Sequence, residues 1–426
     1  MTVLVLSNAR LPDGRIADIS IDHGIITHIG SSDAADRVIN CKNRLCIPAA
    51  ADMHVHMRDG VQAAKETWKS GTEAAAAGGV ATVVDQPNTI PSMETAENFR
   101  QRADLAAKNS VCHFGINGSV TADADFLGLI EAGVLAFGEM FAAPSSYGNA
   151  LTPDVIRDSL RILADHDMLV TVHAEEVLPG EVHSLAEHSR SRPVQGEAET
   201  IRLVQDLAPH GTKLHICHVS GTEAFGTIKD SFEVAPHHLF LSCEETTAEN
   251  TFWKMNPPLR TKKERLALIQ NFAKIPVIAS DHAPHTIQEK SQPFSLAPSG
   301  VPGVETMLPL LMNAVTEQKI TLGQLIGKTV TNPCRILRIP APSLTPGSRA
   351  DLAVYADTPV KISGESLHSR CGWTPYEGMD GVFPVTTVIG GIPAWNGGEF
   401  IMGGGQMWMN ARASQNTENS KNPYNK

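Results

Sequence analysis

The sequence predicts an α/β protein built around a (β/α)8 TIM-type barrel, with a small β-sandwich domain formed by both ends of the chain. Through the middle of the chain, apolar strand-like runs alternate with helix-like segments, which favours parallel strands with crossover helices. Both ends carry short runs of alternating apolar and polar residues instead. Several polar residues directly follow the central runs, and in a barrel these positions form the functional face.

The composition is that of a globular protein with a large core. Of 426 residues, 42% are hydrophobic and 19% are charged. The formal net charge of -11 disfavours nucleic-acid binding, because a phosphate backbone would be repelled. Seven cysteines without a CxxC pair predict a reducing compartment. Since we find no basic leader and no run long enough to span a bilayer, we expect a cytoplasmic protein without a membrane partner.

The two chain ends share one sequence pattern. Short alternating strands separated by turn signals such as Pro12-Asp13-Gly14 occupy the first residues, and similar runs return at 350–355 and 385–389. Each piece is too short to bury a core alone, so we expect the ends to combine. The predicted division is 1–47 with 345–412 for the sandwich, 48–344 for the barrel and 413–426 for a disordered polar tail.

Eight apolar runs are the candidate barrel strands. They are residues 45–50, 79–84, 111–116, 133–137, 168–172, 213–217, 232–235 and 275–279. Helix signals lie between them, most clearly where Thr152 can cap a helix and Pro153 can take its first position.

Histidines and one aspartate follow four of these strands. His54 and His56 are two residues apart after the first strand, so in an extended chain they share a face. His173, His218 and Asp281 follow three later strands. Any one of these histidines alone would more often be a hydrogen-bonded core residue. Four imidazoles and a carboxylate at one barrel face instead predict a site for zinc or a similar metal ion.

Two ions would need a bridge. The first histidine pair with Asp281 could hold one ion, and the two later histidines a second. Glu139, after the fourth strand, is the candidate bridging carboxylate, together with a shared hydroxide. The alternative is that Glu139 is a solvated acid and the site holds one ion. His215, in the run that precedes His218, is not assigned to the metal.

Six motifs carry a more specific signal. They are His54-Val55-His56-Met57-Arg58, Gln86-Pro87-Asn88-Thr89, His173-Ala174-Glu175, His218-Val219-Ser220, Lys254-Met255-Asn256-Pro257-Pro258-Leu259-Arg260 and Asp281-His282-Ala283-Pro284-His285. Together they closely resemble dihydroorotases of the amidohydrolase superfamily. The resemblance continues through 302–306, 331–333 and 347–352, and so covers nearly the whole chain.

The resemblance implies the reversible cyclisation of N-carbamoyl-L-aspartate to L-dihydroorotate, a step of pyrimidine biosynthesis. It implies Zn²⁺ as cofactor, with two ions favoured over one, and Asp281 as the residue that moves a proton between the attacking water and the leaving nitrogen. Many relatives bridge their metals with a carboxylated lysine on the fourth strand. Residues 136–141 contain no lysine, so Glu139 would replace it.

Four residues are expected to bind the substrate. Arg58 can offer two hydrogen bonds to the carboxylate that does not react, and its alternative is a surface salt bridge. Asn88 and His285 match the family's positions for other contacts, and Asn256 is expected to bind the imide edge of the ring. The Pro/Gly-rich segment 286–303 is expected to be either a lid or a plain surface loop.

Two alternative functions stay open at this point. The first is another cyclic amidase, of the hydantoinase, dihydropyrimidinase or allantoinase type, although Arg58 with Asn88 favours a ring that carries a carboxylate. The second is a non-catalytic scaffold that partners aspartate carbamoyltransferase. Homo-oligomer formation is compatible with either function.

Overall fold

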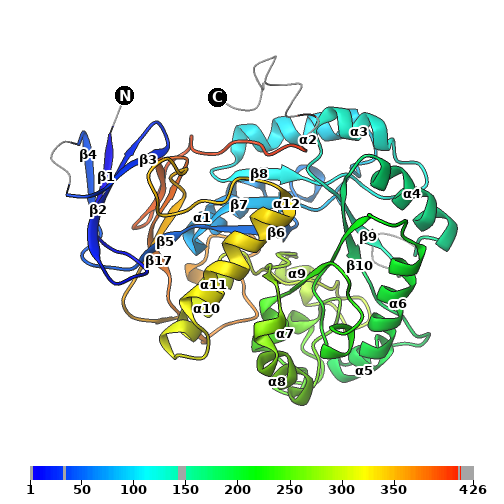
Figure 1. Cartoon of the computed structure of the whole chain (residues 1–426). Coiled ribbons are helices and arrows are strands. Elements are labelled where there is room, and N and C mark those ends of the chain that lie inside the picture. The colour runs from blue at the N-terminus through cyan, green and yellow to red at the C-terminus, as the bar shows by residue number, and fades with distance from the viewer. Residues whose placement is uncertain (1–2, 32–34, 143–149, 411–412, 414–426) are drawn as a thin grey trace.

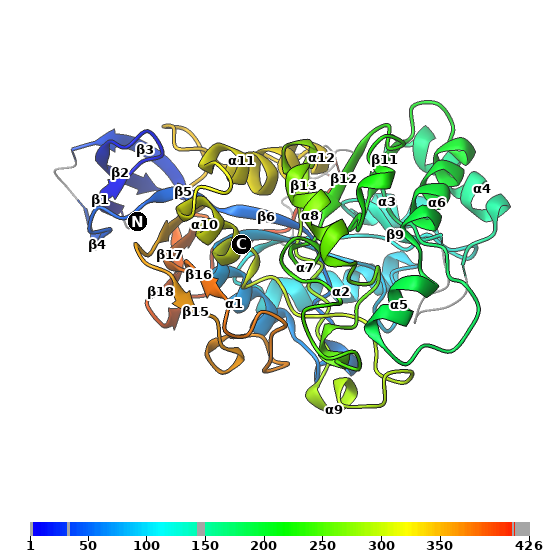
Figure 2. The same ribbon diagram turned by 90° about the horizontal axis from the view of Figure 1, so that it is seen from below.

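The computed structural model describes residues 3–31, 35–142, 150–410 and 413 of the chain. The predicted α/β class is confirmed, with central parallel strands covered by helices and two small sheets beside them (Figures 1 and 2). Apart from Ala413, the tail predicted to be disordered lies outside the described residues. Among the described helices, none is both long and apolar enough to cross a bilayer.

Eight parallel strands form the centre of the molecule. They are β6 (Ala50–Val55), β7 (Val80–Asp85), β8 (His113–Ile116), β9 (Phe137–Phe141), β10 (Leu169–His173), β11 (Lys213–Ile216), β12 (Ser231–Val234) and β13 (Val277–Ile278). They pair in the orders β6-β7-β8 and β9-β10-β11-β12-β13. Parallel bridges between Gly118 and Phe137 and between Val55 and His282 connect the two sheets at both sides. The carboxyl ends of all eight strands therefore face one mouth.

Helices follow most of the central strands. They are α1 (Trp68–Gly78), α2 (Ala96–Asn109), α3 (Phe126–Ala132), α4 (Pro153–Asp165), α5 (Leu185–Ser191), α6 (Val194–Leu207), α7 (Pro236–Phe240), α8 (Lys262–Gln270), α9 (Ile287–Lys290), α10 (Met307–Thr316), α11 (Leu322–Ile326) and α12 (Asn332–Leu337). As predicted, the Thr152 side chain accepts a hydrogen bond from the Val155 amide and Pro153 begins α4.

The predicted first and fourth strands have the wrong boundaries. The run 45–50 divides between two sheets, because β5 (Cys46–Pro48) pairs with β14 (Leu352–Tyr355) and the central strand β6 begins only at Ala50. His54 therefore lies within β6 rather than after it. Likewise β9 begins at Phe137, so Glu139 lies within a strand. Both halves of each run are buried, and continuous apolar character cannot mark where one strand ends.

The two chain ends meet in the small sheets. One contains β1 (Leu4–Arg10), β2 (Ile16–Asp22), β3 (Ile25–Gly30) and β4 (Arg37–Asn40), and the other contains β5, β14, β17 (Pro384–Ile389), β18 (Ile392–Asn396) and β19 (Glu399–Phe400). The short strands β15 (Val360–Lys361) and β16 (Asp380–Gly381) pair separately. Leu6 and Ile19 share one buried cluster with Leu352 and Val388, so residues from both ends exclude water together.

The last described residues leave the small sheets and pack on the central strands. The Phe114 amide of β8 donates to the Gln406 carbonyl at 3.0 Å, and the Trp408 amide donates back to the Phe114 carbonyl at 2.7 Å. This segment was predicted to belong to the sandwich, and in the structure it also forms hydrogen bonds to β8, to Thr82 of β7 and to the carbonyls of Ile130 and Val134.

Asp351 connects the small sheets to the central strands. Its buried carboxylate lies 3.0 Å from Nε2 of His113 in β8, accepts a hydrogen bond from the Gly390 amide at 2.7 Å and contacts the Arg349 guanidinium. Burial alone would raise the pKa of Asp351, but His113 and Arg349 outweigh it and lower the pKa to about 2.

We expect Asp351→Asn to lower the free energy of unfolding by about 3 kcal/mol, because it removes one member of a buried charged network. Urea unfolding at pH 7 measures this loss, and the exposed pair of Asp380 with Lys361 offers the control Asp380→Asn, which should change little. Since the folded pKa of Asp351 lies below the unfolded value of about 3.9, its contribution is present above about pH 4 and is lost toward pH 2. Equal stability of the two variants would contradict the assignment.

Candidate metal and substrate site

His54 is oriented from behind by a buried carboxylate. Its Nδ1 lies 2.5 Å from Oε1 of Glu233 in β12, so its Nε2 faces the mouth of the strands. There Nε2 lies 3.5 Å from Oδ1 of Asp281 and 3.7 Å from Oε2 of Glu139. In the described part of the chain this buried nitrogen has no hydrogen-bond partner. A carboxylate on one ring nitrogen fixes the tautomer that presents the other to a metal.

His56 is oriented in the same way by an amide. Its Nδ1 lies 2.7 Å from Oδ1 of Asn88, and its Nε2 lies 3.3 Å from Oδ1 of Asp281. The backbone holds the residue as well, because the His56 amide donates to the His282 carbonyl at 2.8 Å. The two histidines of the His-x-His motif therefore aim Nε2 at the same carboxylate.

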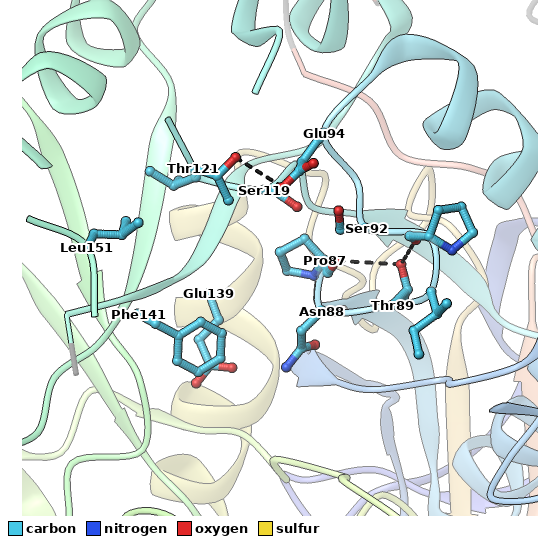
Figure 3. Close-up of a pocket in the computed structure, with 13 residues that line it drawn as sticks. Pro87, Asn88, Thr89, Ser92, Glu94, Ser119, Thr121, Glu139, Phe141 and Leu151 are labelled. Carbon is cyan, nitrogen blue, oxygen red and sulfur yellow. Dashed lines mark hydrogen bonds between the residues drawn. The ribbon is translucent and has the colours of Figure 1, made fainter. Parts of the chain in front are cut away.

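Glu139 lies between histidines from three strands. Its Oε1 is 2.8 Å from Nδ1 of His173 and 2.8 Å from Nε2 of His218, while its Oε2 faces His54. Burial alone would raise the pKa of Glu139, but the imidazoles around it hold the pKa well below its usual range. The carboxylate is therefore ionised and shared. Figure 3 shows its side chain extending to the same side of a pocket as that of Asn88.

His173 is paired on both of its nitrogens. Its Nε2 lies 2.7 Å from Oε2 of Glu175, which also accepts a hydrogen bond from Arg192 at 2.5 Å. Burial opposes ionisation of Glu175, but Arg192 and His173 lower its pKa to about 2. An ionised Glu175 directs the Nδ1 of His173 toward Glu139.

The donor set fits a divalent metal ion. The ligand atoms of His54, His56 and Glu139 all lie within 4.8 Å of one another, as do those of Glu139, His173 and His218. Imidazole nitrogen and carboxylate oxygen are ligands that zinc accepts. The structure thus brings together all six residues predicted as ligands from the sequence. They are His54, His56, Glu139, His173, His218 and Asp281.

A cavity of about 50 Å³ opens over these ligands. Arg58, Asn88 and Asn256, three of the four residues predicted to bind substrate, line it together with Ser299 and Gly300. Arg58 is only 3% exposed, which excludes its alternative interpretation as a surface salt bridge. The cavity therefore presents a guanidinium and two amides beside the ligand cluster.

His285 has a different environment from the other three. Its Nε2 lies 3.1 Å from the Ser299 carbonyl, and its Nδ1 lies 3.3 Å from Nζ of Lys65 and 3.6 Å from Glu289. Burial is the main cause that lowers its pKa to about 3, so the ring is neutral. These contacts join His285 to the wall of the cavity at Ser299.

A second pocket of about 380 Å³ lies beside the first (Figure 3). It shares Asn88, Glu139 and Phe141 with the cavity over the ligands. The rest of its lining includes hydroxyl groups and Glu94, which accepts a hydrogen bond from Thr121 at 3.1 Å. The ligand cluster is therefore adjacent to a larger pocket with a mixed polar and apolar lining.

Two orienting carboxylates, Glu175 and Glu233, were not among the site residues predicted from the sequence. Glu233 lies between His54 and His215, with its Oε2 3.1 Å from Nε2 of the latter. Burial would raise its pKa, but His54 and His215 lower it to about 2. Both acids carried a signal. Glu233 interrupts an apolar strand, and Glu175 follows a predicted ligand by two residues. His215 itself bonds Ser231 and Glu233, away from the ligand cluster.

Comparisons with known proteins identify the family. Residues 45–392 match the amidohydrolase family. The chain belongs to this family. Among its relatives is the dihydroorotase of Methanosarcina mazei, 38% identical over 437 residues that cover 92% of this chain and 95% of that protein. The dihydroorotase of Halobacterium salinarum is 38% identical over 410 residues, covering 92% and 96%. The resemblance of this amidohydrolase to dihydroorotases is thereby confirmed.

Solved structures show the same fold. The L-hydantoinase (dihydropyrimidinase) from Arthrobacter aurescens matches the amidohydrolase with a TM-score of 0.87 at 24% identity, covering 96% of this chain and all of that one. The D-hydantoinase from a Thermus species matches with a TM-score of 0.81 at 21% identity, covering 95% and 98%. At this identity the match describes the fold and leaves the substrate open.

We expect Glu233→Gln to weaken metal binding by the amidohydrolase about 10- to 100-fold, because the neutral amide no longer holds the tautomer of His54. Titration of the metal-free protein with zinc, followed by calorimetry, measures the affinity. Glu305→Gln is the matched control, since Glu305 is also buried but bonds His368 instead. An affinity that stays equal in both variants would show that Glu233 does not orient a metal ligand.

Proposed function

We propose that this amidohydrolase is a dihydroorotase, which interconverts N-carbamoyl-L-aspartate and L-dihydroorotate in pyrimidine biosynthesis. One observation carries the proposal beyond the family. Arg58 lines the same cavity as the histidine and carboxylate cluster. Dihydroorotate carries a carboxylate that does not react, and a guanidinium recognises such a group through paired hydrogen bonds. The dihydroorotase relatives support the same assignment.

The proposed cofactor is Zn²⁺, with two ions favoured. His54, His56 and Asp281 would hold one ion, His173 and His218 the other, and Glu139 would bridge them. When bound, zinc lowers the pKa of a water molecule and polarises a carbonyl group. The shared position of Glu139 between His173, His218 and His54 supports the bridging role.

Asp281 is the proposed proton carrier. Burial would raise its pKa, but the hydrogen bond from His56 and the charges of the nearby histidines hold the pKa below its usual range. The carboxylate is therefore ionised at neutral pH. In ring opening it accepts the proton of the attacking water and transfers it to the leaving amide nitrogen, and in ring closure the transfers reverse.

Three residues are proposed to orient the ring. Arg58 binds the substrate carboxylate. The side-chain oxygen of Asn88 contacts His56, so the NH₂ group of Asn88 can donate to the same carboxylate. Asn256 is held by His188, whose Nε2 lies 2.9 Å from its Oδ1, so its NH₂ group can donate to an imide carbonyl. His285 then acts through the Ser299 carbonyl that it contacts.

We further propose that β6 to β13 close as a (β/α)8 barrel over 48–344, with a composite β-sandwich domain from 1–47 and 345–412. The parallel bridges at both sides of the central sheets and the shared cluster of Leu6 and Leu352 support this division. A cytoplasmic location agrees with seven cysteines that are all buried and unpaired. Homo-oligomer formation and association with aspartate carbamoyltransferase stay predictions for sedimentation analysis.

Two experiments separate the dihydroorotase from its alternatives. The zinc-loaded protein should turn over dihydroorotate faster than dihydrouracil or allantoin. We expect Arg58→Met to lower kcat/KM for dihydroorotate about 10- to 100-fold, because it removes a charged hydrogen-bonding pair. The same substitution should not lower turnover of dihydrouracil, which has no carboxylate. Preference for dihydrouracil would assign the protein to the dihydropyrimidinases, and no turnover of any ring would favour a scaffold.

We expect Glu139→Ala to lower both the bound zinc and the rate, because the two ions lose the carboxylate between them. Elemental analysis after gel filtration gives zinc per chain, and steady-state kinetics gives the rate. Glu94→Ala is the control, since Glu94 lines the neighbouring pocket and bonds Thr121. An unaltered second ion in Glu139→Ala would show that the bridge is elsewhere.

A further inference from the structure

The segment after α9 is folded around the side chain of Lys290. This lysine is fully buried, and its Nζ donates to the carbonyl oxygens of Lys254 and Pro298 at 3.0 Å and of Gly300 at 3.1 Å. Three carbonyl oxygens match the three protons of an ammonium group. The backbone around Pro298 and Gly300 is therefore fixed to one buried amino group.

Lys254 holds the preceding part of the same segment. Its Nζ donates to the carbonyl oxygens of Phe294 and Ala297, both at 2.7 Å. Its own carbonyl accepts from the Gly300 amide at 3.0 Å as well as from Lys290. The two lysines thus hold the segment 294–300 at five hydrogen-bonded points.

No carboxylate of the described residues forms an ion pair with either ammonium. Aromatic ring faces lie beside both amino groups, since Nζ of Lys254 lies 5.0 Å from the Phe294 ring centroid and Nζ of Lys290 lies 5.6 Å from that of Trp373. A buried ammonium is costly unless its donors are satisfied. Opening the segment would therefore remove the hydrogen-bond acceptors of both buried amino groups.

The segment held in this way borders the substrate cavity. Ser299 lies between the two carbonyl-bonded residues Pro298 and Gly300, and Ser299 and Gly300 line the cavity. Gly300 has φ +134, and a Cβ atom there would lie 2.6 Å from the Ala283 carbonyl oxygen. The Gly300 backbone therefore forms part of the cavity wall and packs closely against Ala283, two residues past Asp281.

We propose that Lys254 and Lys290 are positioning residues that hold the Ser299–Gly300 backbone as a fixed wall against the bound ring. The proposal rests on the dihydroorotase function for its kinetic consequence. On this proposal both earlier interpretations of segment 286–303 are replaced, because the stretch is neither a lid that opens nor a plain surface loop. The lysines act through the backbone and do not touch the reacting atoms.

Substitution of either lysine tests the kinetic consequence. We expect Lys254→Met and Lys290→Met to raise KM for dihydroorotate about tenfold or more, because the substrate would bind to a cavity whose wall is no longer fixed. The value of kcat should stay within about threefold, because the cluster of histidines and carboxylates is unchanged. Zinc per chain should equal that of the wild type. The control is Lys319→Met, an exposed lysine paired with Glu317. An unchanged KM, or a loss of kcat and zinc at constant KM, would overturn the proposal.

Hydrogen exchange of the wild-type protein tests the wall without any assay of activity. The amides of Ala297 and Gly300, which donate to Pro293 and Lys254, should exchange as slowly as those inside α10. Rapid exchange there would overturn the fixed wall even if Lys290→Met failed to fold. Slow exchange in a protein that does not turn over dihydroorotate would refute the proposed function but still support the fixed wall at Ser299–Gly300.

Discussion

The central constraint of this structure is one buried carboxylate shared by several imidazoles. Glu139 contacts His173 and His218 through the same oxygen and faces His54 with the other. These residues come from separate strands, so the contacts exist only if the strands meet at one mouth with matched register. A carboxylate in a dry site is stable only while those partners surround it. The arrangement of the strands and the ionised state of Glu139 therefore depend on each other.

The parts predictable from sequence are those in which one residue carries both a structural and a chemical signal. His54, His56, His173, His218 and Asp281 follow apolar runs, and that pattern was sufficient to predict their convergence. Glu139 was predicted from the need for an anion between two metal ions, because it is the acid at the end of the fourth run. The strand boundaries near 45–50 and 133–137 were wrong because both neighbours of each boundary are buried. The role of Glu233 could not be predicted from sequence distance, because its partner His54 lies 179 positions away, whereas Glu175 lies only two positions from His173.

A second set of side chains, which lies behind the histidines of the cluster, orients their rings. Glu233 orients His54, Glu175 orients His173 and Asn88 orients His56, each through the ring nitrogen that faces away from the cluster. The wall at Ser299–Gly300 is oriented by backbone carbonyls around two lysines instead. The ligands need a fixed tautomer, which a carboxylate or amide supplies. The wall needs only a fixed backbone, for which carbonyl acceptors are sufficient.

The same logic explains how Arg58 is held in an unfavourable backbone conformation. Arg58 has φ 50, which costs a residue with a side chain about 1 kcal/mol or more. Asp85 at the end of β7 offsets this cost, because one oxygen accepts from the Met57 amide at 2.8 Å and the other accepts from Arg102 at 2.7 and 2.9 Å. Arg102 in turn donates to the Arg58 carbonyl. The buried Asp85 and Arg102 thus hold the backbone on both sides of Arg58 by hydrogen bonds. Because this stretch directly follows His56, the backbone of Arg58 is fixed beside the cluster of histidines and carboxylates. The carboxylate recognition proposed for Arg58 would thereby be coupled to β6, the strand that carries His54.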